Sequence, residues 1–302
     1  MWPIIDGLCG KEHGAGNKMK GLGKKLVAIL GVMALALAGA WWWLRHDYAS
    51  YCASGGFVLE YHSIGSHPDW PQGMVIAPAV FEKHLRYLQE NGYHMVTVAE
   101  LADRLATGKT MDKYIALSFD DGYTDNYTEA FPLLKKYGAK GTFSVINSKI
   151  GGNIYMTADQ IQEMERAGME IASHTFSHNR LADIDPKYLD WEIGTSKYDL
   201  EKRLLSKHKS ITTLAYPCGS YNEQTIAKLK QYGYKAALTG NEFLNTPQWY
   251  KEHPMEMCRL IVMDDGKNAY TFAALLHKGN WRSYLRDRGI DIRFWENFSS
   301  FI

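Results

Sequence analysis

The chain has 302 residues, of which 46% are hydrophobic and 22% charged, and its formal net charge at pH 7 is +1. This composition is typical of a folded globular protein and excludes a disordered or low-complexity chain. The near balance of 34 basic and 33 acidic residues argues against a nucleic-acid-binding protein, so we expect no nucleic-acid partner. Four cysteines in a chain of this length exclude a disulfide-dense scaffold.

Residues 26–44, LVAILGVMALALAGAWWWL, are an apolar segment without a charged side chain. A helix of this length rises about 28 Å, close to the thickness of the hydrocarbon core of a bilayer. Four lysines precede the segment in residues 18–25 and three tryptophans close it, which fits the positive-inside rule and the interfacial preference of tryptophan. We therefore predict a cytoplasmic segment (1–25), one transmembrane anchor (26–44) and a tether (45–55), with the rest of the chain outside the cell membrane.

A cleaved signal peptide is the alternative for this segment. Ala36-Leu37-Ala38 and Ala38-Gly39-Ala40 both fit a small-x-small cleavage site, and cleavage would yield a secreted protein. The three adjacent tryptophans are a poor context for cleavage, so we favour the anchor.

Beyond residue 55, short apolar runs alternate with segments of helical periodicity. We predict strands at 57–60, 94–98, 114–119, 141–146, 169–173, 211–216, 235–239 and 257–263, and helices at 80–90, 99–105, 127–137, 157–167, 186–207, 223–232 and 269–276. This alternation predicts an α/β domain with a parallel sheet, open or closed into a barrel, whose functional residues lie at the carboxyl ends of the strands.

The first unusual strand end is Ser118-Phe119-Asp120-Asp121-Gly122, in which two adjacent carboxylates follow an apolar strand. Such neighbours need not point the same way, so one can bind a metal while the other handles a proton. A bound cation would also relieve their mutual repulsion. The alternative is an ordinary Asp-Gly turn.

The second strand end carries His174 and His178, four residues apart and therefore able to meet on one helical face or in one tight turn. Two imidazoles and one aspartate with open coordination positions are typical of catalytic zinc. Two unrelated histidines are the alternative. The third strand end, Ala215–Tyr221, contains Pro217 and Gly219, which fix a loop able to aim a backbone N–H into a site; a plain turn is the alternative.

These motifs resemble those of the polysaccharide deacetylases with a NodB-homology domain, carbohydrate esterase family 4. The family's motif T/S-F-D-D-G matches Ser118–Gly122, H-S/T-x-x-H matches His174–His178, and R-x-P-Y/F-G is matched in part by Ala215–Gly219. The resemblance covers roughly residues 56–265 and implies a distorted parallel (β/α) barrel. We place the domain at 56–276 and a C-terminal tail at 277–302.

Two further segments resemble the family branch that acts on poly-N-acetylglucosamine: Tyr61-His62 near the start and Met257–Val262 near the end. The resemblance implies a polysaccharide substrate.

The resemblance also implies a role for each matching residue. Asp121, His174 and His178 would hold a divalent metal, usually zinc, and Asp120 would be the general base for the attacking water. The backbone N–H of Cys218 would stabilise the oxyanion. The products would be acetate and a free amine.

A second set of residues would line a sugar groove, with ordinary packing as the alternative. These residues are Tyr123, Tyr216, Pro217 and Tyr221.

The chain departs from the family pattern in two roles, the arginine that orients the catalytic aspartate and the general acid. Ala215 replaces the arginine that orients the catalytic aspartate; Arg259 is a candidate substitute, although a surface salt bridge would equally explain it. The general acid has two candidates: His277, in the Leu275-Leu276-His277 match to the family's Leu-x-His motif, and His62.

We therefore expect a membrane-anchored, metal-dependent N-deacetylase of N-acetylglucosamine-containing polymers. The candidate polymers are poly-N-acetylglucosamine, peptidoglycan glycan and chitin-like oligomers. Two alternatives are a weakly active sugar-binding domain on the same fold and an O-acetyl esterase acting on xylan-like polymers.

Overall fold

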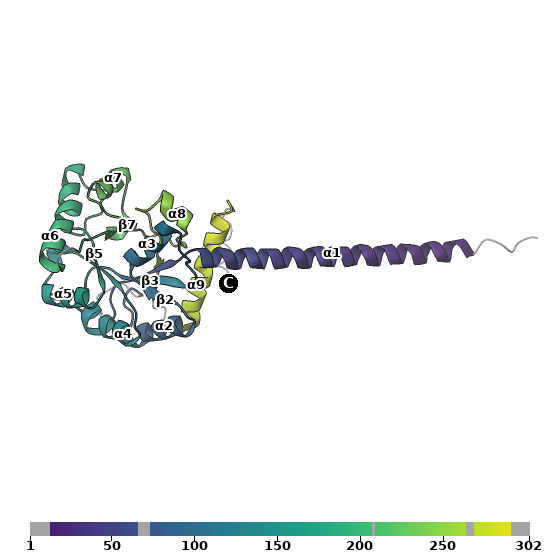
Figure 1. Cartoon of the computed structure of the whole chain (residues 1–302), viewed down its shortest axis with the longest axis horizontal. Coiled ribbons are helices and arrows are strands. Elements are labelled where there is room, and N and C mark those ends of the chain that lie inside the picture. The colour runs from purple at the N-terminus through teal and green to yellow at the C-terminus, as the bar shows by residue number, and fades with distance from the viewer. Residues whose placement is uncertain (1–12, 66–72, 207–208, 264–268, 291–302) are drawn as a thin grey trace, which may run out of the picture. The chain divides into compact units, whose positions relative to one another are not determined.

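The computed structural model describes residues 13–65, 73–206, 209–263 and 269–290, and the chain divides into two compact units, Met1–Ser50 and Tyr51–Ile302. Helix α1 (His13–Ser54) makes up the described part of the first unit (Figure 1). Its segment Lys25–Ser54 is long and apolar enough to cross a membrane, a property that signal sequences share. The helix extends beyond residue 44, the predicted end of the apolar segment, because residues 45–54 contain no glycine or proline and Gly55 is the first.

The second unit is built on an eight-stranded parallel sheet in the order β7-β6-β5-β4-β3-β1-β8, with β2 also pairing with β3. The strands are β1 (Phe57–Tyr61), β2 (His94–Val96), β3 (Tyr114–Phe119), β4 (Thr142–Val145), β5 (Glu170–Ser173), β6 (Thr213–Ala215), β7 (Ala236–Leu238) and β8 (Leu260–Ile261). Met257 bridges to Leu238 of β7, and Leu260 then pairs with Leu59 of β1, which draws the two edges of the sheet together. The predicted α/β fold of the NodB type, with its parallel sheet curled into a half-barrel, is confirmed.

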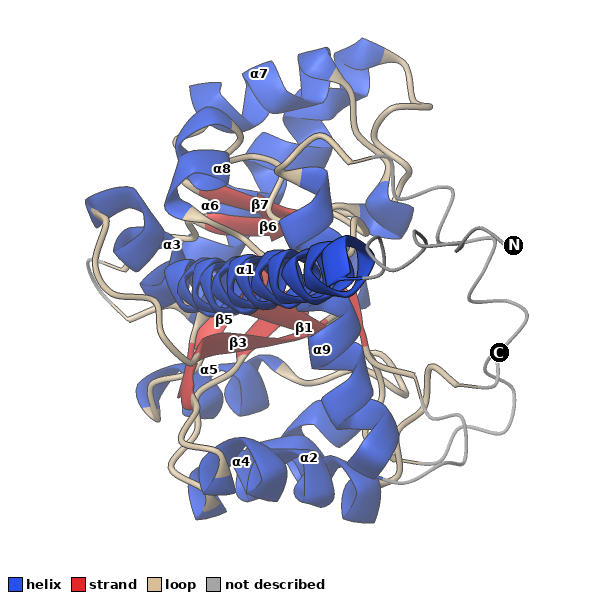
Figure 2. Cartoon of the chain, turned by 90° about the vertical axis from the view of Figure 1, so that its right-hand side faces the viewer, coloured by secondary structure: helices blue, strands red, loops and turns tan. Residues whose placement is uncertain are grey.

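The predicted helices occur in the expected order, and the structure adds one that was not predicted, at Pro247–Glu252. In the second unit they are α2 (Pro78–Glu90), α3 (Val98–Thr107), α4 (Phe131–Lys136), α5 (Ala158–Arg166), α6 (Ser196–Leu204), α7 (Glu223–Gln231), α8 (Pro247–Glu252) and α9 (Ala269–Arg286). Short helical turns are η1 (Asn126–Ala130), η2 (Asn147–Lys149), η3 (Pro186–Tyr188), η4 (Asp190–Thr195) and η5 (Pro217–Gly219). Figure 2 shows these helices arranged around the sheet, with α2 and α4 on one side of it.

Two predicted helices differ from those observed. The segment 186–207 begins at Asp185 as expected, but it is divided into η3, the π-helical η4 and α6. Within η4, Gly194 lies against the ring of Tyr232, where a larger residue would collide. The last helix runs on to Arg286, ten residues beyond the predicted end.

The two faces of the sheet carry different residues because successive strand residues point to opposite sides. One face packs against the outer helices with large apolar side chains: Leu59, Tyr61, Leu117, Phe119, Phe143, Val145, Ile171 and Leu214. The other face meets Val98, Leu101 and Leu105 of α3 and Tyr250 of α8 through smaller ones: Val58, Ala116, Ala215, Ala236 and Leu238. By the same alternation Glu60, Ser118, Thr142, Ser144 and Glu170 also belong to this inner face, which therefore combines an apolar plug with buried polar groups.

The start of α3 is held by side chains of the inner face. The Val98 N–H donates to Thr142 Oγ1 at 2.8 Å, and the Ala99 N–H donates to Glu170 Oε2 at 2.9 Å. The hydroxyl of Thr142 in turn donates to Glu170 at 2.8 Å. First-turn N–H groups have no partner inside a helix, so this arrangement satisfies donors that α3 would otherwise bury unpaired.

Replacing Thr142→Val should therefore lower the free energy of unfolding by about 1–3 kcal/mol, because the Val98 N–H loses its buried acceptor. Ser144→Ala is the matched control, since Ser144 lies on the same strand and its buried hydroxyl has no hydrogen-bond partner among the described residues. Urea unfolding of the detergent-solubilised chain measures both. An equal decrease in the free energy of unfolding of the two variants would contradict a stabilising hydrogen bond between α3 and Thr142.

Candidate active site

The two adjacent carboxylates separate where β3 ends. The Asp120 N–H still donates to the Tyr61 carbonyl at 2.9 Å, which continues the β1–β3 ladder by one residue. Asp121 then adopts φ 73° and Gly122 φ 78°, so the chain turns sharply between the two side chains. A Cβ at Gly122 would also lie 3.0 Å from Val145 Cγ1, so both its backbone conformation and its close packing favour glycine.

The side chains of Asp121, His174 and His178 converge on one point. Asp121 Oδ1 lies 3.4 Å from His174 Nε2 and 3.4 Å from His178 Nε2, and all three potential ligand atoms lie within 4.8 Å of one another. Ligand atoms bound tetrahedrally to one zinc ion at about 2.1 Å lie about 3.4 Å apart. The observed spacing therefore fits a divalent cation held by one carboxylate and two imidazoles.

His174 is fixed with the correct nitrogen facing this point. Its Nδ1–H donates to the Ala215 carbonyl at 2.9 Å, which leaves Nε2 directed towards Asp121. Burial disfavours the charged form of His174, but the nearby carboxylates of Asp120 and Asp121 outweigh burial and raise its pKa. His178 is more open, with 34% of its side chain exposed. The site thus opens to solvent beside His178.

The loop that carries the two histidines is held by Glu192 of η4, which is 2% exposed. The Ser177 N–H donates to Glu192 Oε2 at 2.9 Å, and Asn179 Nδ2 donates to Oε1 at 2.8 Å. Thr175 and His178 both have positive φ, 66° and 64°. The buried carboxylate of Glu192 holds the loop through these hydrogen bonds, and the loop therefore keeps a backbone conformation that is unfavourable in free energy.

Asp120 pairs with Arg259 inside the half-barrel. Arg259 Nη1 donates to Asp120 Oδ2 at 2.7 Å, and both side chains are 2% exposed. Burial disfavours the charged form of Asp120, but the Arg259 guanidinium outweighs burial and holds the pKa of the carboxyl well below its usual range. The interpretation of Arg259 as a surface salt bridge is therefore wrong. Position 215, where the motif has an arginine that orients the catalytic aspartate, is an alanine in this chain, and the guanidinium of Arg259 contacts Asp120 instead.

Arg259 also contacts Glu60, a residue that the sequence patterns did not single out. Its Nε lies 3.0 Å from Glu60 Oε2 and donates to the Thr239 carbonyl at 2.9 Å. His62 Nε2 lies 3.7 Å from Glu60 Oε1, and potential ligand atoms of Glu60, His62 and Asp120 all lie within 4.8 Å of one another.

His62, not His277, is the candidate general acid that the structure brings to the site. His277 is exposed on α9, two residues before Gly279, which packs against Phe57 at the amino end of β1. The site residues lie at the carboxyl ends of the strands, so the structure does not place His277 among them.

The loop after β6 presents the backbone of Cys218. Cys218 is exposed and has φ 53°, and its N–H donates to no acceptor among the described residues. The N–H is thus available to an oxygen from outside the protein.

Tyr216 and Pro217 are corrected from groove residues to core residues, because both are buried. The Tyr216 hydroxyl donates to the Met255 carbonyl at 3.0 Å. Tyr221 stacks on Tyr216 at 4.7 Å between centroids and stays half-buried. Tyr123 is 5% exposed and stacks on Tyr155 at 5.3 Å. Burial, together with the charge and hydrogen bond of Asp121, raises the pKa of Tyr123.

Comparison with known proteins agrees with this geometry. Residues 107–237 match the model of the family described as polysaccharide deacetylase. The matched region includes Asp120 and Asp121, both histidines and the loop after β6. Residues 107–237 form a polysaccharide deacetylase domain.

Two curated relatives and two solved structures resemble this chain. YxkH of Bacillus subtilis, named as a polysaccharide deacetylase, is 36% identical over 183 residues, which are 60% of this chain and 63% of YxkH. The chain therefore matches less than two thirds of the length of that relative. The poly-β-1,6-N-acetyl-D-glucosamine N-deacetylase of Staphylococcus aureus is 27% identical over 201 residues, 63% of this chain and 68% of that protein.

Both solved structures are matched almost completely. The Streptococcus pyogenes deacetylase PplD in complex with acetate has a TM-score of 0.67 and 26% identity, over 74% of this chain and 99% of that one. IcaB from Ammonifex degensii has a TM-score of 0.64 and 25% identity, over 74% and 97%.

Replacing His174→Ala should lower the zinc content of the purified chain to well under one ion per chain, because one of three ligands is lost. The control is His277→Ala, which removes an exposed imidazole from α9 and should leave the zinc content unchanged. Atomic emission spectrometry of both variants checks this. A fully loaded His174→Ala chain would show that this ligand assignment is wrong.

Proposed function

We propose that the chain is a membrane-anchored, zinc-dependent N-deacetylase, which hydrolyses acetamido groups of an N-acetylglucosamine polymer outside the cell. The observation that carries the proposal is the convergence of Asp121, His174 and His178 beside Asp120, a second carboxylate held by Arg259. The names of the Staphylococcus aureus relative and of the matched deacetylase structure support the choice of reaction. The deacetylase domain would span residues 56–276, with 277–302 as its tail.

The location rests on α1. Its apolar segment would anchor the chain in the cell membrane, and the deacetylase domain would face the extracellular polymer. Cleavage after the small-residue sites is the alternative, and it would release the same domain. Mass spectrometry of the chain from membranes distinguishes the two, because a cleaved chain lacks residues 1–38 or 1–40.

The proposed chemistry assigns one task to each group. Asp121, His174 and His178 would hold a divalent cation, which would act as a Lewis acid towards the amide carbonyl and a nearby water. Asp120, kept ionised by Arg259, accepts the proton of the attacking water. As the carbonyl carbon becomes tetrahedral, the Cys218 N–H donates to its oxygen. His62 then donates a proton to the leaving nitrogen, and acetate and a free amine result.

The test is acetate release by the full chain in detergent. The substrates are poly-N-acetylglucosamine, chitin oligomers, peptidoglycan glycan and acetylated xylan. We expect acetate from an N-acetylated polymer, loss of release after chelation and recovery with zinc. Binding of polymer without acetate release would favour a sugar-binding domain, and release from xylan alone would favour an O-acetyl esterase; either result overturns the proposal.

Asp120→Asn should reduce kcat by about 10²–10⁴, because the amide cannot accept the proton, while zinc content is unchanged. Initial rates of acetate release and metal analysis on the same preparation check both parts. An unchanged rate would remove Asp120 as the general base.

Arg259→Lys keeps a positive charge but cannot contact Asp120, Glu60 and the Thr239 carbonyl with one planar group. We expect kcat to fall by about tenfold or more with KM nearly unchanged, because the general base loses its fixed position while the polymer surface is intact. Arg282→Lys, in a more exposed pair with Glu242, is the control. A higher KM with unchanged kcat would indicate that Arg259 acts on substrate binding.

A further inference from the structure

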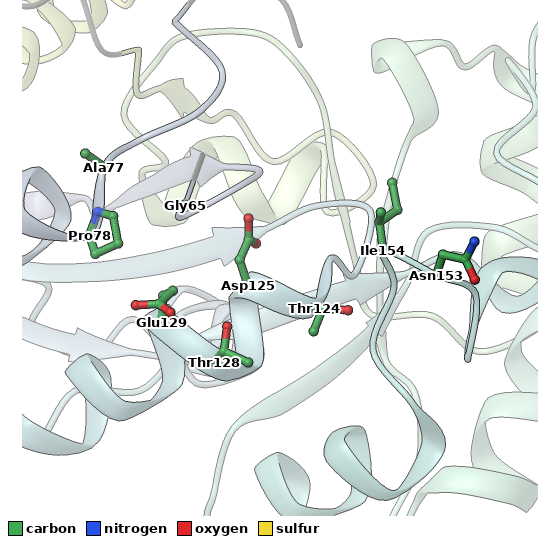
Figure 3. A pocket seen from close by; sticks show the side chains of 9 residues that line it. All are labelled: Gly65, Ala77, Pro78, Thr124, Asp125, Thr128, Glu129, Asn153 and Ile154. Carbon is green, nitrogen blue, oxygen red and sulfur yellow. The ribbon is translucent and has the colours of Figure 1, made fainter. Parts of the chain in front are cut away.

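Figure 3 shows the residues that line a cavity of about 660 Å³, formed by segments that follow the site residues His62 and Asp121 in the chain. One wall comes from the segment that follows Asp121 and Gly122, and it includes Thr124, Asp125 and Glu129. Gly65, three residues after His62, lies on another wall. Strands β1 and β3 are direct neighbours, so both segments leave the sheet at the same edge, next to the carboxylates of the site.

The walls of this cavity are held in place by hydrogen bonds between neighbouring segments. Ser63 Oγ donates to Asp125, and Asn126 Nδ2 donates to the His62 carbonyl at 2.8 Å. The Thr124 N–H donates to the Ile154 carbonyl at 2.9 Å. The cavity is therefore formed before any ligand arrives, and the contacts that form it also hold His62.

The lining of the cavity combines polar and apolar residues, and its charge is negative. Asp125 and Glu129 are acidic, Thr124 and Thr128 offer hydroxyls, and none of its described lining residues is a lysine or arginine. Glu129 is exposed and makes no ion pair with any described cation. Pro78 and Ile154 add apolar surface of the kind that the C–H face of a sugar ring contacts. This lining suits a sugar that carries positive charge.

We propose that this cavity binds a glucosamine unit of the polymer, a sugar already deacetylated, through its ammonium group at Glu129 and Asp125. The inference rests on the proposed function, because removal of an acetyl group is what leaves a free amine, protonated at neutral pH, on the chain. The enzyme then prefers a polymer that already contains free amines near the reacting unit. Free amines left by earlier turnovers therefore create further binding partners, and deacetylated units accumulate in runs.

Binding is tested first without any acetyl group to hydrolyse. The full chain in detergent is titrated by calorimetry with a β-1,6-linked glucosamine pentamer and with its fully N-acetylated counterpart. We expect the amine form to bind more tightly, and its affinity to fall as salt is raised. Glu129→Gln should weaken this binding by about threefold to tenfold, and Glu129→Lys should weaken it further. Glu223→Gln, the same change at an exposed site on α7, is the matched control.

Acetate release then separates this inference from the proposed function. The wild-type chain should show a higher kcat/KM on a pentamer with one free amine than on the fully acetylated pentamer, and Glu129→Lys should abolish that preference while it still hydrolyses the acetylated one. Equal binding of both pentamers, or binding unaffected by Glu129→Lys, would overturn the inference and leave the proposed function standing. No acetate from any polymer would overturn the proposed function, and the titration would still decide what the cavity binds.

Discussion

The buried ion pair between Arg259 and Asp120 is the interaction on which the arrangement of the site depends. Two carboxylates, Asp120 and Glu60, lie on the inner face of the half-barrel where water cannot screen them, and one guanidinium contacts both. A buried charge without a partner would cost several kcal/mol. Removing any one of these three groups would therefore destabilise the fold, because it would leave a buried charge uncompensated. Because Arg259 comes just before β8, at one edge of the sheet, and its Nε also donates to the carbonyl of Thr239, just after β7 at the other edge, Arg259 also joins the two edges.

The site is positioned by backbone conformations that most residues avoid. Asp121, Thr175, His178 and Cys218 all have positive φ, and all four lie at carboxyl ends of strands. Each such residue costs about 1 kcal/mol or more. In the loop after β5, the Ser177 N–H donates to Glu192 and the His178 N–H donates to Thr175 Oγ1, and these hydrogen bonds hold the conformation. Rigid strands therefore place the segments, while strained turns give each side chain its direction.

The site residues that the sequence predicted are those that belong to short, continuous motifs. Asp120, Asp121, His174 and His178 follow apolar strands directly, so their position at one edge of the sheet followed from the α/β alternation. Glu60 and Glu192 were missed because their importance comes from contacts with Arg259 and Ser177, which are distant in sequence or lie across a loop. Tyr216 was misassigned because residues at a strand end alternate between core and cavity, and the sequence alone does not say which side each takes.

The apolar plug formed by α3 and α8 has a consequence for how a long polymer would reach this site. Because Leu101, Leu105 and Tyr250 pack against the inner face of the sheet, the half-barrel is closed at that end and a sugar chain cannot thread through it. A polymer would instead lie sideways across the rim and offer any acetylated unit along its length. A half-barrel that is closed at one end would therefore favour deacetylation of units inside the polymer, without a need for free chain ends.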